Sequence, residues 1–148
     1  MDLFDINTWA LSGVCTTETW ALWLLFLSSF LAATLLPGGS EIVLFGIIRC
    51  HPDLMAESLL IATIGNTLGG MTSYLIGRFF KSPESFKYID TVRKYGAISL
   101  ILAWAPIIGD ILCVTAGWLR ICWFWSMIWM TIGKFARYWL VVSVAQAL

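Results

Sequence analysis

Charged residues are scarce in this chain. Only 12% of its 148 residues are Asp, Glu, Lys or Arg, and the formal net charge is zero. Soluble domains carry about 25% charged residues, so a surface of this composition is not suited to water. A net charge of zero also removes the electrostatic basis for nucleic-acid binding. With 59% hydrophobic residues and a mean hydropathy of +0.84, the composition predicts an integral membrane protein surrounded by lipids.

Histidine and closely spaced cysteines are also scarce. The chain has one histidine, His51, and its four cysteines form no C-x-x-C pair, so we expect no metal site. P-loop motifs and nucleophile–base pairs are missing too, so we expect no enzymatic activity and no cofactor. We interpret the cysteines as small apolar packing residues.

The first 17 residues contain two aspartates but no lysine or arginine. The basic region of a cleavable signal peptide is therefore missing, and we expect the apolar segments to serve as uncleaved insertion signals. Tryptophan is abundant, with nine copies, and its amphipathic ring favours the membrane interface.

A proline that precedes an acid by four residues occurs twice inside apolar sequence. The first copy has Pro37 and Glu41, and the second has Pro106 and Asp110, 69 residues later. The triplet I-G-N at 64–66 also returns as I-G-K after 68 residues. Two like halves with interrupted hydrophobic segments are typical of transporters whose site lies where broken helices meet.

The first half begins with an uncharged apolar segment, 19–36. At about 1.5 Å per residue it nearly crosses a hydrocarbon core of about 30 Å. We predict a hairpin break at Pro37, Gly38 and Gly39, after which 41–48 is too short to span. The sequence leaves open whether 19–36 spans the bilayer or re-enters on the same side.

The second half repeats this arrangement with shorter pieces. Residues 96–105 are apolar, the predicted break includes Pro106 and Gly109, and 111–119 follow. Irregular backbone at membrane depth is tolerated only where protein or water covers it. We therefore expect the two breaks to face each other or to line a cavity.

Each hairpin is followed by a transmembrane candidate, 54–80 in the first half and 122–148 in the second. Small residues allow another helix to approach closely, and the first candidate contains four predicted helix-packing glycines: Gly65, Gly69, Gly70 and Gly77.

We predict an all-α integral membrane fold in one domain, 1–148. The first repeat covers about 19–80, a linker about 81–94, and the second repeat about 95–148. One spanning helix per half is an odd number, so the second repeat inserts upside down. Basic residues around the linker place it in the cytoplasm by the positive-inside rule: Arg78, Lys81, Lys87, Arg93 and Lys94.

Four charged residues lie inside the apolar segments: Glu41, Asp110, Lys134 and Arg137. A charge at the bilayer centre costs about 2.5–3.5 kcal/mol on insertion scales, so we expect these groups to pair or to face water. In one interpretation the acids carry protons and the bases attract an anionic substrate. In the other, two ion pairs only lock the hairpins to the last helix.

Three groups of motifs occur in a fixed order: L-L-P-G-G-S-E, I-G-N-T-L-G-G-M-T-S-Y-L-I-G-R, and W-A-P-I-I-G-D followed by A-G-W-L-R and G-K-F-A-R-Y. Together they resemble the DedA superfamily, also called SNARE-associated or VTT-domain proteins. The last group is most similar to the short YqaA branch of bacterial inner-membrane proteins. The similarity covers roughly 25–142. It implies two opposed re-entrant hairpins, an inner-membrane location and movement of lipids.

The chain departs from the superfamily pattern at three places. Two arginines that many members have in the second hairpin are replaced by Ala103 and Gly109. In the first hairpin many members have an acid at the position of Gly39, whereas the acid of this chain, Glu41, comes two residues later. An additional upstream Glu of the family has no counterpart in 19–36. We interpret Lys134 and Arg137 as the substitute for the missing positive charge.

The sequence thus predicts a DedA-type transporter or scramblase that moves an anionic lipid or polyprenyl phosphate, with proton coupling. So few helices favour a homodimer. A non-transporting scaffold or accessory subunit, or a cation/proton exchanger, remains the alternative. The predicted roles are proton coupling by Glu41 and Asp110, phosphate binding by Lys134 and Arg137, and lining of the path by Asn66 and Tyr74.

Overall fold

The computed structural model describes residues 17–34, 39–80, 88–105 and 108–147. These residues form helices and short connections and contain no strand, which confirms the all-α prediction. The elements in chain order are α2 (Glu18–Ala32), α3 (Ser40–Cys50), the 3₁₀ helix η1 (Pro52–Leu54), α4 (Met55–Phe79), α5 (Ile89–Tyr95), the 3₁₀ helix η2 (Gly96–Trp104), α6 (Ile108–Trp118) and α7 (Trp123–Ala147).

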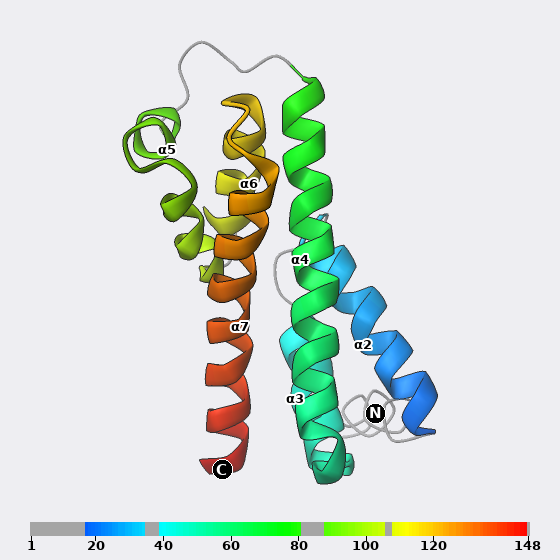
Figure 1. Cartoon of the computed structure of the whole chain (residues 1–148). Helices are drawn as coiled ribbons and strands as arrows, with labels where there is room; N and C mark the ends of the chain where they lie inside the picture. Colours follow the sequence, from blue (N-terminus) through cyan, green and yellow to red (C-terminus); the bar gives the residue numbers. More distant parts are fainter. Residues whose placement is uncertain (1–16, 35–38, 81–87, 106–107, 148) are drawn as a thin grey trace, which may run out of the picture.

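Two long helices, α4 and α7, run side by side in opposite directions and set the height of the molecule (Figure 1). Each has 25 residues and is therefore about 37 Å long, enough for a hydrocarbon core of about 30 Å. Among the described residues, only 52–79 are both long and apolar enough to cross a membrane. Helix α7 has the length but not that apolar composition, so its crossing stays a prediction.

The shorter elements lie along opposite halves of the two long helices (Figure 1). Helices α2 and α3 lie beside the half where α4 begins, and η2 and α6 lie beside the half where it ends. Helix α2 has 15 residues, about 22 Å, and α3 returns toward the end from which α2 started. Helix α2 therefore does not follow α4 over its full length.

The packing partners are repeated between the two halves. Helix α2 packs on α4 and η2 packs on α7, so each first hairpin arm contacts the long helix of its own half. The second arms cross over, since α3 contacts α7 and α6 packs on α4. These contacts form two matching sets. Each contact maps onto another when α2 is exchanged with η2, α3 with α6, and α4 with α7.

The predicted breaks lie only partly within the described structure. Pro37, Gly38 and Pro106 fall outside the described residues. Gly39 precedes α3 with a φ of 154°, a conformation that side chains with a Cβ atom rarely adopt. Gly109 was predicted to be part of the second break, but it is the second residue of α6, where a Cβ would lie 2.6 Å from the carbonyl oxygen of Ala103 in η2.

Glycines of α4 lie where two neighbouring helices come closest. A Cβ added at Gly69 would lie 2.5 Å from the carbonyl oxygen of Phe30, and Gly65 faces α2 in the same way. Gly77 lies against the backbone of Val114 in α6. The missing side chains therefore let both hairpins approach α4 at van der Waals distance.

One boundary differs from expectation. Residues 89–94, predicted as linker, form most of α5, because Ile89 and Val92 bury their side chains against the bundle.

The packing role predicted for the cysteines holds for buried Cys113 but not for exposed Cys122, and Cys50 is disulfide-bonded. Sequence spacing alone does not show which cysteines the fold brings within bonding distance.

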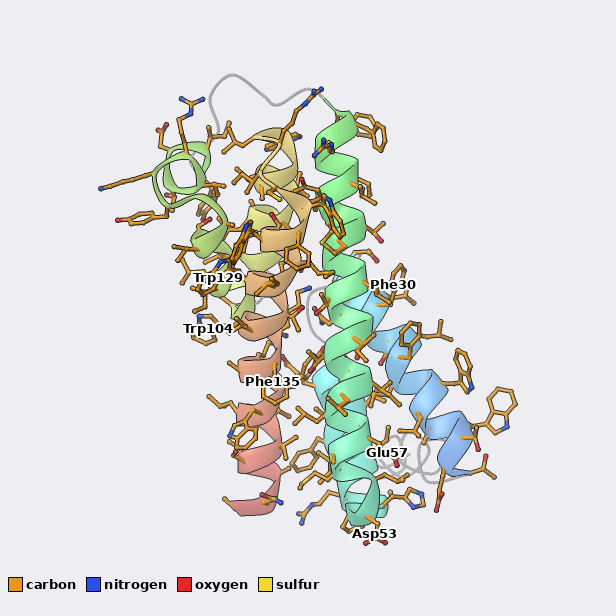
Figure 2. All side chains as sticks on the ribbon, in the orientation of Figure 1. Phe30, Asp53, Glu57, Trp104, Trp129 and Phe135 are labelled. Carbon is orange, nitrogen blue, oxygen red and sulfur yellow. The ribbon has the colours of Figure 1, made fainter. Side chains whose placement is uncertain are left out.

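Apolar side chains cover the outside of the bundle, and many polar side chains lie inside it (Figure 2). Exposed residues include Trp20, Trp23, Ile42, Leu60, Trp104, Trp139 and Leu140. Buried residues include Ser40, Ser58, Asn66, Thr115, Ser126 and Lys134. A water-soluble helical bundle has the opposite distribution, so these surfaces fit a lipid environment.

Two apolar clusters fill the interior, one in each half. The α2–α3 cluster contains Ala21, Leu25, Leu44, Ile47, Ile48, Leu59, Ala62, Tyr138, Val142 and Ala145. The η2–α6 cluster contains Tyr74, Val92, Leu100, Ala103, Leu112, Cys113, Ala116 and Met130. Each hairpin therefore has its own core against α4 and α7.

Candidate functional site

Two neighbouring groups of polar contacts, Ser40–Tyr138–Asn66–Lys134–Asp110 and Glu41–Arg137, join the two hairpins to the two long helices. We call them together the polar layer, and its members are Ser40, Glu41, Asn66, Asp110, Lys134, Arg137 and Tyr138. Helices α3, α4, α6 and α7 each contribute at least one residue. The acids belong to the first turn of the second hairpin arms, immediately after the predicted breaks.

Lys134 lies at the centre of the polar layer. Its side chain is 2% exposed, and its Nζ lies 4.0 Å from Oδ1 of Asp110. Nζ also donates a hydrogen bond of 2.5 Å to the backbone oxygen of Asn66. A Cβ at Gly70 would lie 2.8 Å from this Nζ, so glycine leaves the space that the ammonium group occupies.

Arg137 binds the acid of the other hairpin. Its Nε donates to Oε1 of Glu41 at 2.5 Å, and its Nη2 contacts the same oxygen. Arg137 is 15% exposed and Glu41 is 35% exposed, so this pair is open to the surroundings on the acid's side. Lys134 and Arg137 are three residues apart, which places both on one face of α7.

Tyr138 connects the two long helices with α3. Its hydroxyl accepts a hydrogen bond of 2.7 Å from Nδ2 of Asn66 and shares one of 2.9 Å with Oγ of Ser40. Both Tyr138 and Ser40 are fully buried. Sequence reasoning missed these two residues; the available signal was that Tyr138 follows Lys134 by four residues, which places it on the same helix face.

The structure does not bring Tyr74 into the polar layer. Its hydroxyl bonds to the backbone oxygen of Ile121 and accepts a bond of 3.1 Å from Nη1 of Arg78. Tyr74 follows Asn66 by eight residues on α4. That spacing keeps the helix face, but it also moves Tyr74 about 12 Å along the axis, into the η2–α6 cluster.

Positions related by the sequence echo have related contacts. Glu41 and Asp110, 69 residues apart, each pair with a base on α7. Asn66 and Lys134, 68 residues apart, contact each other directly.

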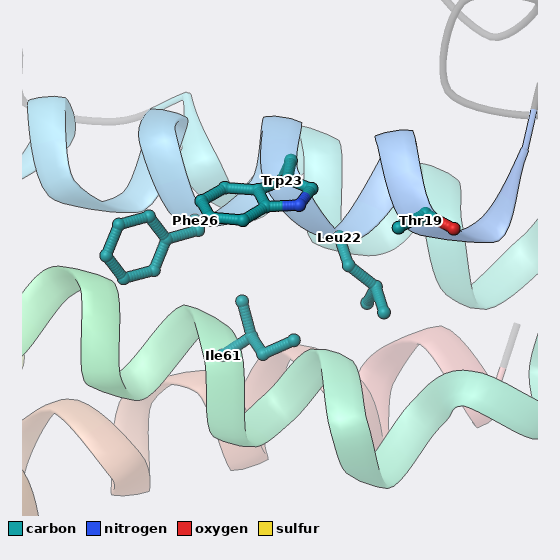
Figure 3. Close-up of a pocket in the computed structure, with 5 residues that line it drawn as sticks. All are labelled: Thr19, Leu22, Trp23, Phe26 and Ile61. Carbon is teal, nitrogen blue, oxygen red and sulfur yellow. The ribbon is translucent and has the colours of Figure 1, made fainter.

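Within the part of the chain that the structure describes, no cluster of three or more His, Cys, Asp or Glu side chains could hold a metal ion. A shallow groove of about 320 Å³ lies between α2 and α4, lined by Thr19, Leu22, Trp23, Phe26 and Ile61 (Figure 3). Its lining is almost entirely apolar and contains no charged side chain.

Comparison with known proteins identifies close relatives. The chain is 42% identical over 138 residues to inner membrane protein YqaA of Escherichia coli K12, covering 88% of this chain and 93% of the relative. The YqaA protein of Shigella flexneri gives the same values. An uncharacterized protein of Haemophilus influenzae is 37% identical over 155 residues, covering 93% and 92%. No protein-family model and no solved structure matches the chain.

Proposed function

This chain belongs to the YqaA family of bacterial inner membrane proteins, and we propose that it moves an anionic lipid or polyprenyl phosphate across that membrane. The observation that carries the proposal is the polar layer. It holds two acid–base pairs inside a bundle whose outer surface is apolar.

In this proposal α4 and α7 cross the bilayer, and the two hairpins re-enter it from opposite sides. The repeated packing partners and the contact between Asn66 and Lys134 support two inverted repeats. Helix α2 ends and α6 begins near the middle of the bundle (Figure 1). The polar layer then lies at the depth where a lipid headgroup meets its highest barrier.

The distribution of charge supports the predicted orientation. At the end of the bundle where α4 ends, the described charged residues are Arg78, Asp90, Arg93, Lys94 and Arg120. At the opposite end they are Glu18, Arg49, Asp53 and Glu57, the last two labelled in Figure 2. The positive-inside rule therefore favours a cytoplasmic position for the first of these ends, next to the linker.

The disulfide of Cys50 supports the same orientation independently. Cys50 is the last residue of α3, at the end opposite the linker. Disulfides persist in the bacterial periplasm and are rare in the cytosol. A periplasmic position for this end agrees with a cytoplasmic linker.

The exposure of the acids favours transport over a purely structural lock. The side chains of Glu41 and Asp110 are each 35% exposed, although Lys134 beside Asp110 is only 2% exposed. An acid that exchanges protons must stay reachable. Accessible acids next to enclosed bases are therefore what proton-coupled anion movement requires.

The superfamily resemblance adds the substrate class. DedA-type proteins are linked to movement of lipids, and a phosphate headgroup needs positive charge inside the membrane. Lys134 and Arg137 supply it here, where the superfamily has its hairpin arginines. A membrane scaffold would need neither the accessible acids nor the enclosed bases.

Lipid translocation in proteoliposomes tests the proposal. Purified protein is reconstituted, and movement of a fluorescent phospholipid and of a polyprenyl phosphate is followed with and without a pH gradient. We expect movement that Glu41→Gln/Asp110→Asn abolishes. The matched control is Asp53→Asn/Glu57→Gln, which removes two exposed acids near the first residue of α4 and should transport like wild type.

Three outcomes would refute parts of the proposal. Folded wild-type protein that moves neither lipid would exclude transport of these two lipids. Equal loss of lipid movement in the Asp53→Asn/Glu57→Gln control would show that the acids of the polar layer are not specifically required for transport. Movement of protons or cations without lipid would favour the cation/proton exchanger instead.

A further inference from the structure

A second groove, of about 440 Å³, lies between η2 and α7. Unlike the groove in Figure 3, it has a cationic side chain in its lining. Ile101 and Trp104 of η2 form one wall, and Ile132, Ala136 and Leu140 of α7 form the other. Its charged member is Arg137 of the polar layer. We call this feature the Arg137 groove.

The Arg137 groove opens toward the outside of the bundle. Its large apolar side chains are between 41% and 59% exposed, and Trp104 lies on the side of α7 that faces away from α4 (Figure 2). In a membrane such a groove faces lipid chains. Volumes of this size are typical of small-molecule sites.

Arg137 has hydrogen-bonding capacity left in this groove. Its Nε and Nη2 both bond Oε1 of Glu41, so the pair uses one edge of the guanidinium group. A guanidinium has five N–H donors, and the Nη1 edge suits a second planar or tetrahedral anion. Phosphate oxygens fit such a donor fork well.

The depth of the groove selects among lipids. Trp104 is the last residue of η2, directly before the second hairpin's predicted break, and Arg137 belongs to the polar layer and lies near the middle of α7. A lipid at rest keeps its phosphate at the membrane interface, about half a bilayer thickness from this point. A lipid whose phosphate reaches Arg137 is therefore in transit.

We infer that the Arg137 groove holds one hydrocarbon chain of a lipid phosphate halfway across the membrane, with its phosphate against the guanidinium of Arg137. This rests on the transport function proposed above and adds the place where the chain lies. A zwitterionic lipid has a phosphate whose charge is offset by its own ammonium group, so its contact with Arg137 would be weaker. A neutral lipid without phosphate would find the same apolar walls but no anion–cation contact.

The close approach of η2 to α7 keeps the groove shallow. A Cβ at Gly133 would lie 2.6 Å from the carbonyl oxygen of Ile101, so only glycine lets η2 form its wall. Ala136 is an exposed small residue on the opposite wall. A large side chain there fills the groove without entering the core.

Ala136→Phe tests occupancy through transport. We expect it to lose lipid-phosphate movement in proteoliposomes. Its matched control is Val144→Phe, which adds the same ring to an exposed position of α7 outside the groove and should move lipid like wild type. If wild type transports and both variants transport equally, the groove is not used while the proposed function stands.

Protection from modification tests binding without transport. Ala136→Cys is introduced together with Cys122→Ser, because Cys122 is an exposed free thiol, and maleimide labelling is followed in nanodiscs of zwitterionic lipid. Cys122→Ser alone gives the background. We expect added phosphatidic acid or polyprenyl phosphate to slow labelling, and Arg137→Gln to remove that protection.

The other probes separate the alternatives. Protection by inorganic phosphate alone would indicate a free-anion site and overturn the chain-binding part. Equal protection by added neutral lipid, or protection that survives Arg137→Gln, would mean that any membrane chain fills the groove. Absence of protection by every probe would also overturn the inference. Protection without any transport by wild type would retain the binding site and refute the transport function.

Discussion

Removing the charge of Asp110 should destabilise the protein because it leaves Lys134 without its counter-ion. Lys134 is 2% exposed and lies 4.0 Å from Asp110, and its other contact is the uncharged backbone oxygen of Asn66. Two unit charges about 4 Å apart attract by about 4 kcal/mol at an effective dielectric constant of 20. Breaking a buried pair costs about 3–5 kcal/mol because the remaining charge stays buried.

The exposure of Asp110 lowers this figure. Its side chain is 35% exposed, so water already screens part of the attraction. For Asp110→Asn we expect a loss of about 2–3 kcal/mol in the free energy of unfolding. For a chain of this size that corresponds to a melting temperature lower by roughly 5–10 °C.

A double-mutant cycle in detergent micelles measures this coupling. Asp110→Asn, Lys134→Met and the double variant are compared with wild type by thermal unfolding. The double variant should recover to within about 1 kcal/mol of wild type, because replacing both partners of a buried pair by uncharged groups is often nearly neutral. Glu57→Gln, an exposed control, should change stability by less than about 0.5 kcal/mol.

Two results would refute this reasoning. If Asp110→Asn melts like wild type, then Asp110 does not hold Lys134, and the ammonium group is stabilised by the Asn66 carbonyl alone. If the double variant is as unstable as Asp110→Asn, the loss comes from contacts of Asp110 other than its charge.

Three further predictions concern the Tyr138 hydroxyl, the packing of Gly69 and the orientation of the chain. Tyr138→Phe should cost about 1–3 kcal/mol, seen as a lower melting temperature, because the Asn66 amide loses its buried acceptor; unchanged melting would show that another group replaces the phenol. Gly69→Ala should cost about 1–3 kcal/mol by the same measurement, since its Cβ would lie 2.5 Å from the Phe30 oxygen; a neutral effect would mean that α2 can move away. Lys94→Cys should resist membrane-impermeant thiol reagents added outside intact cells, and rapid labelling would reverse the proposed orientation.

The all-helical fold could be predicted from the sequence, but the pairing of charges could not. The spacing of Lys134 and Arg137 predicted one shared helix face, and the structure puts both in the polar layer. Which base meets which acid depends on how α7 packs between the hairpins. Helical periodicity fixes the face of a residue but not its neighbour on another element.

The residues that sequence reasoning placed differently also have physical reasons. Periodicity grouped Tyr74 with Asn66 because it gives the angle around a helix and ignores the distance along it. Tyr138 was overlooked because a phenol in an apolar helix is common at membrane interfaces. The segment 19–36 was long enough nearly to span, but α2 ends at Ala32, and the hydroxyl of Thr34 bonds back to carbonyls of its last turn.

The ion pair between Glu41 and Arg137 suggests a physical basis for the proposed proton coupling. Glu41 neutralises Arg137 in the structure, so an incoming phosphate meets a guanidinium whose charge is already matched. When Glu41 takes up a proton, Arg137 keeps an unmatched charge in the polar layer, and the nearby Lys134 carries the same sign. The phosphate is then the anion that restores neutrality. Such linkage is reciprocal, so a proton on Glu41 and a phosphate on Arg137 each favour the binding of the other. Proton and lipid phosphate would therefore cross together, which a structural lock with permanently paired charges does not allow.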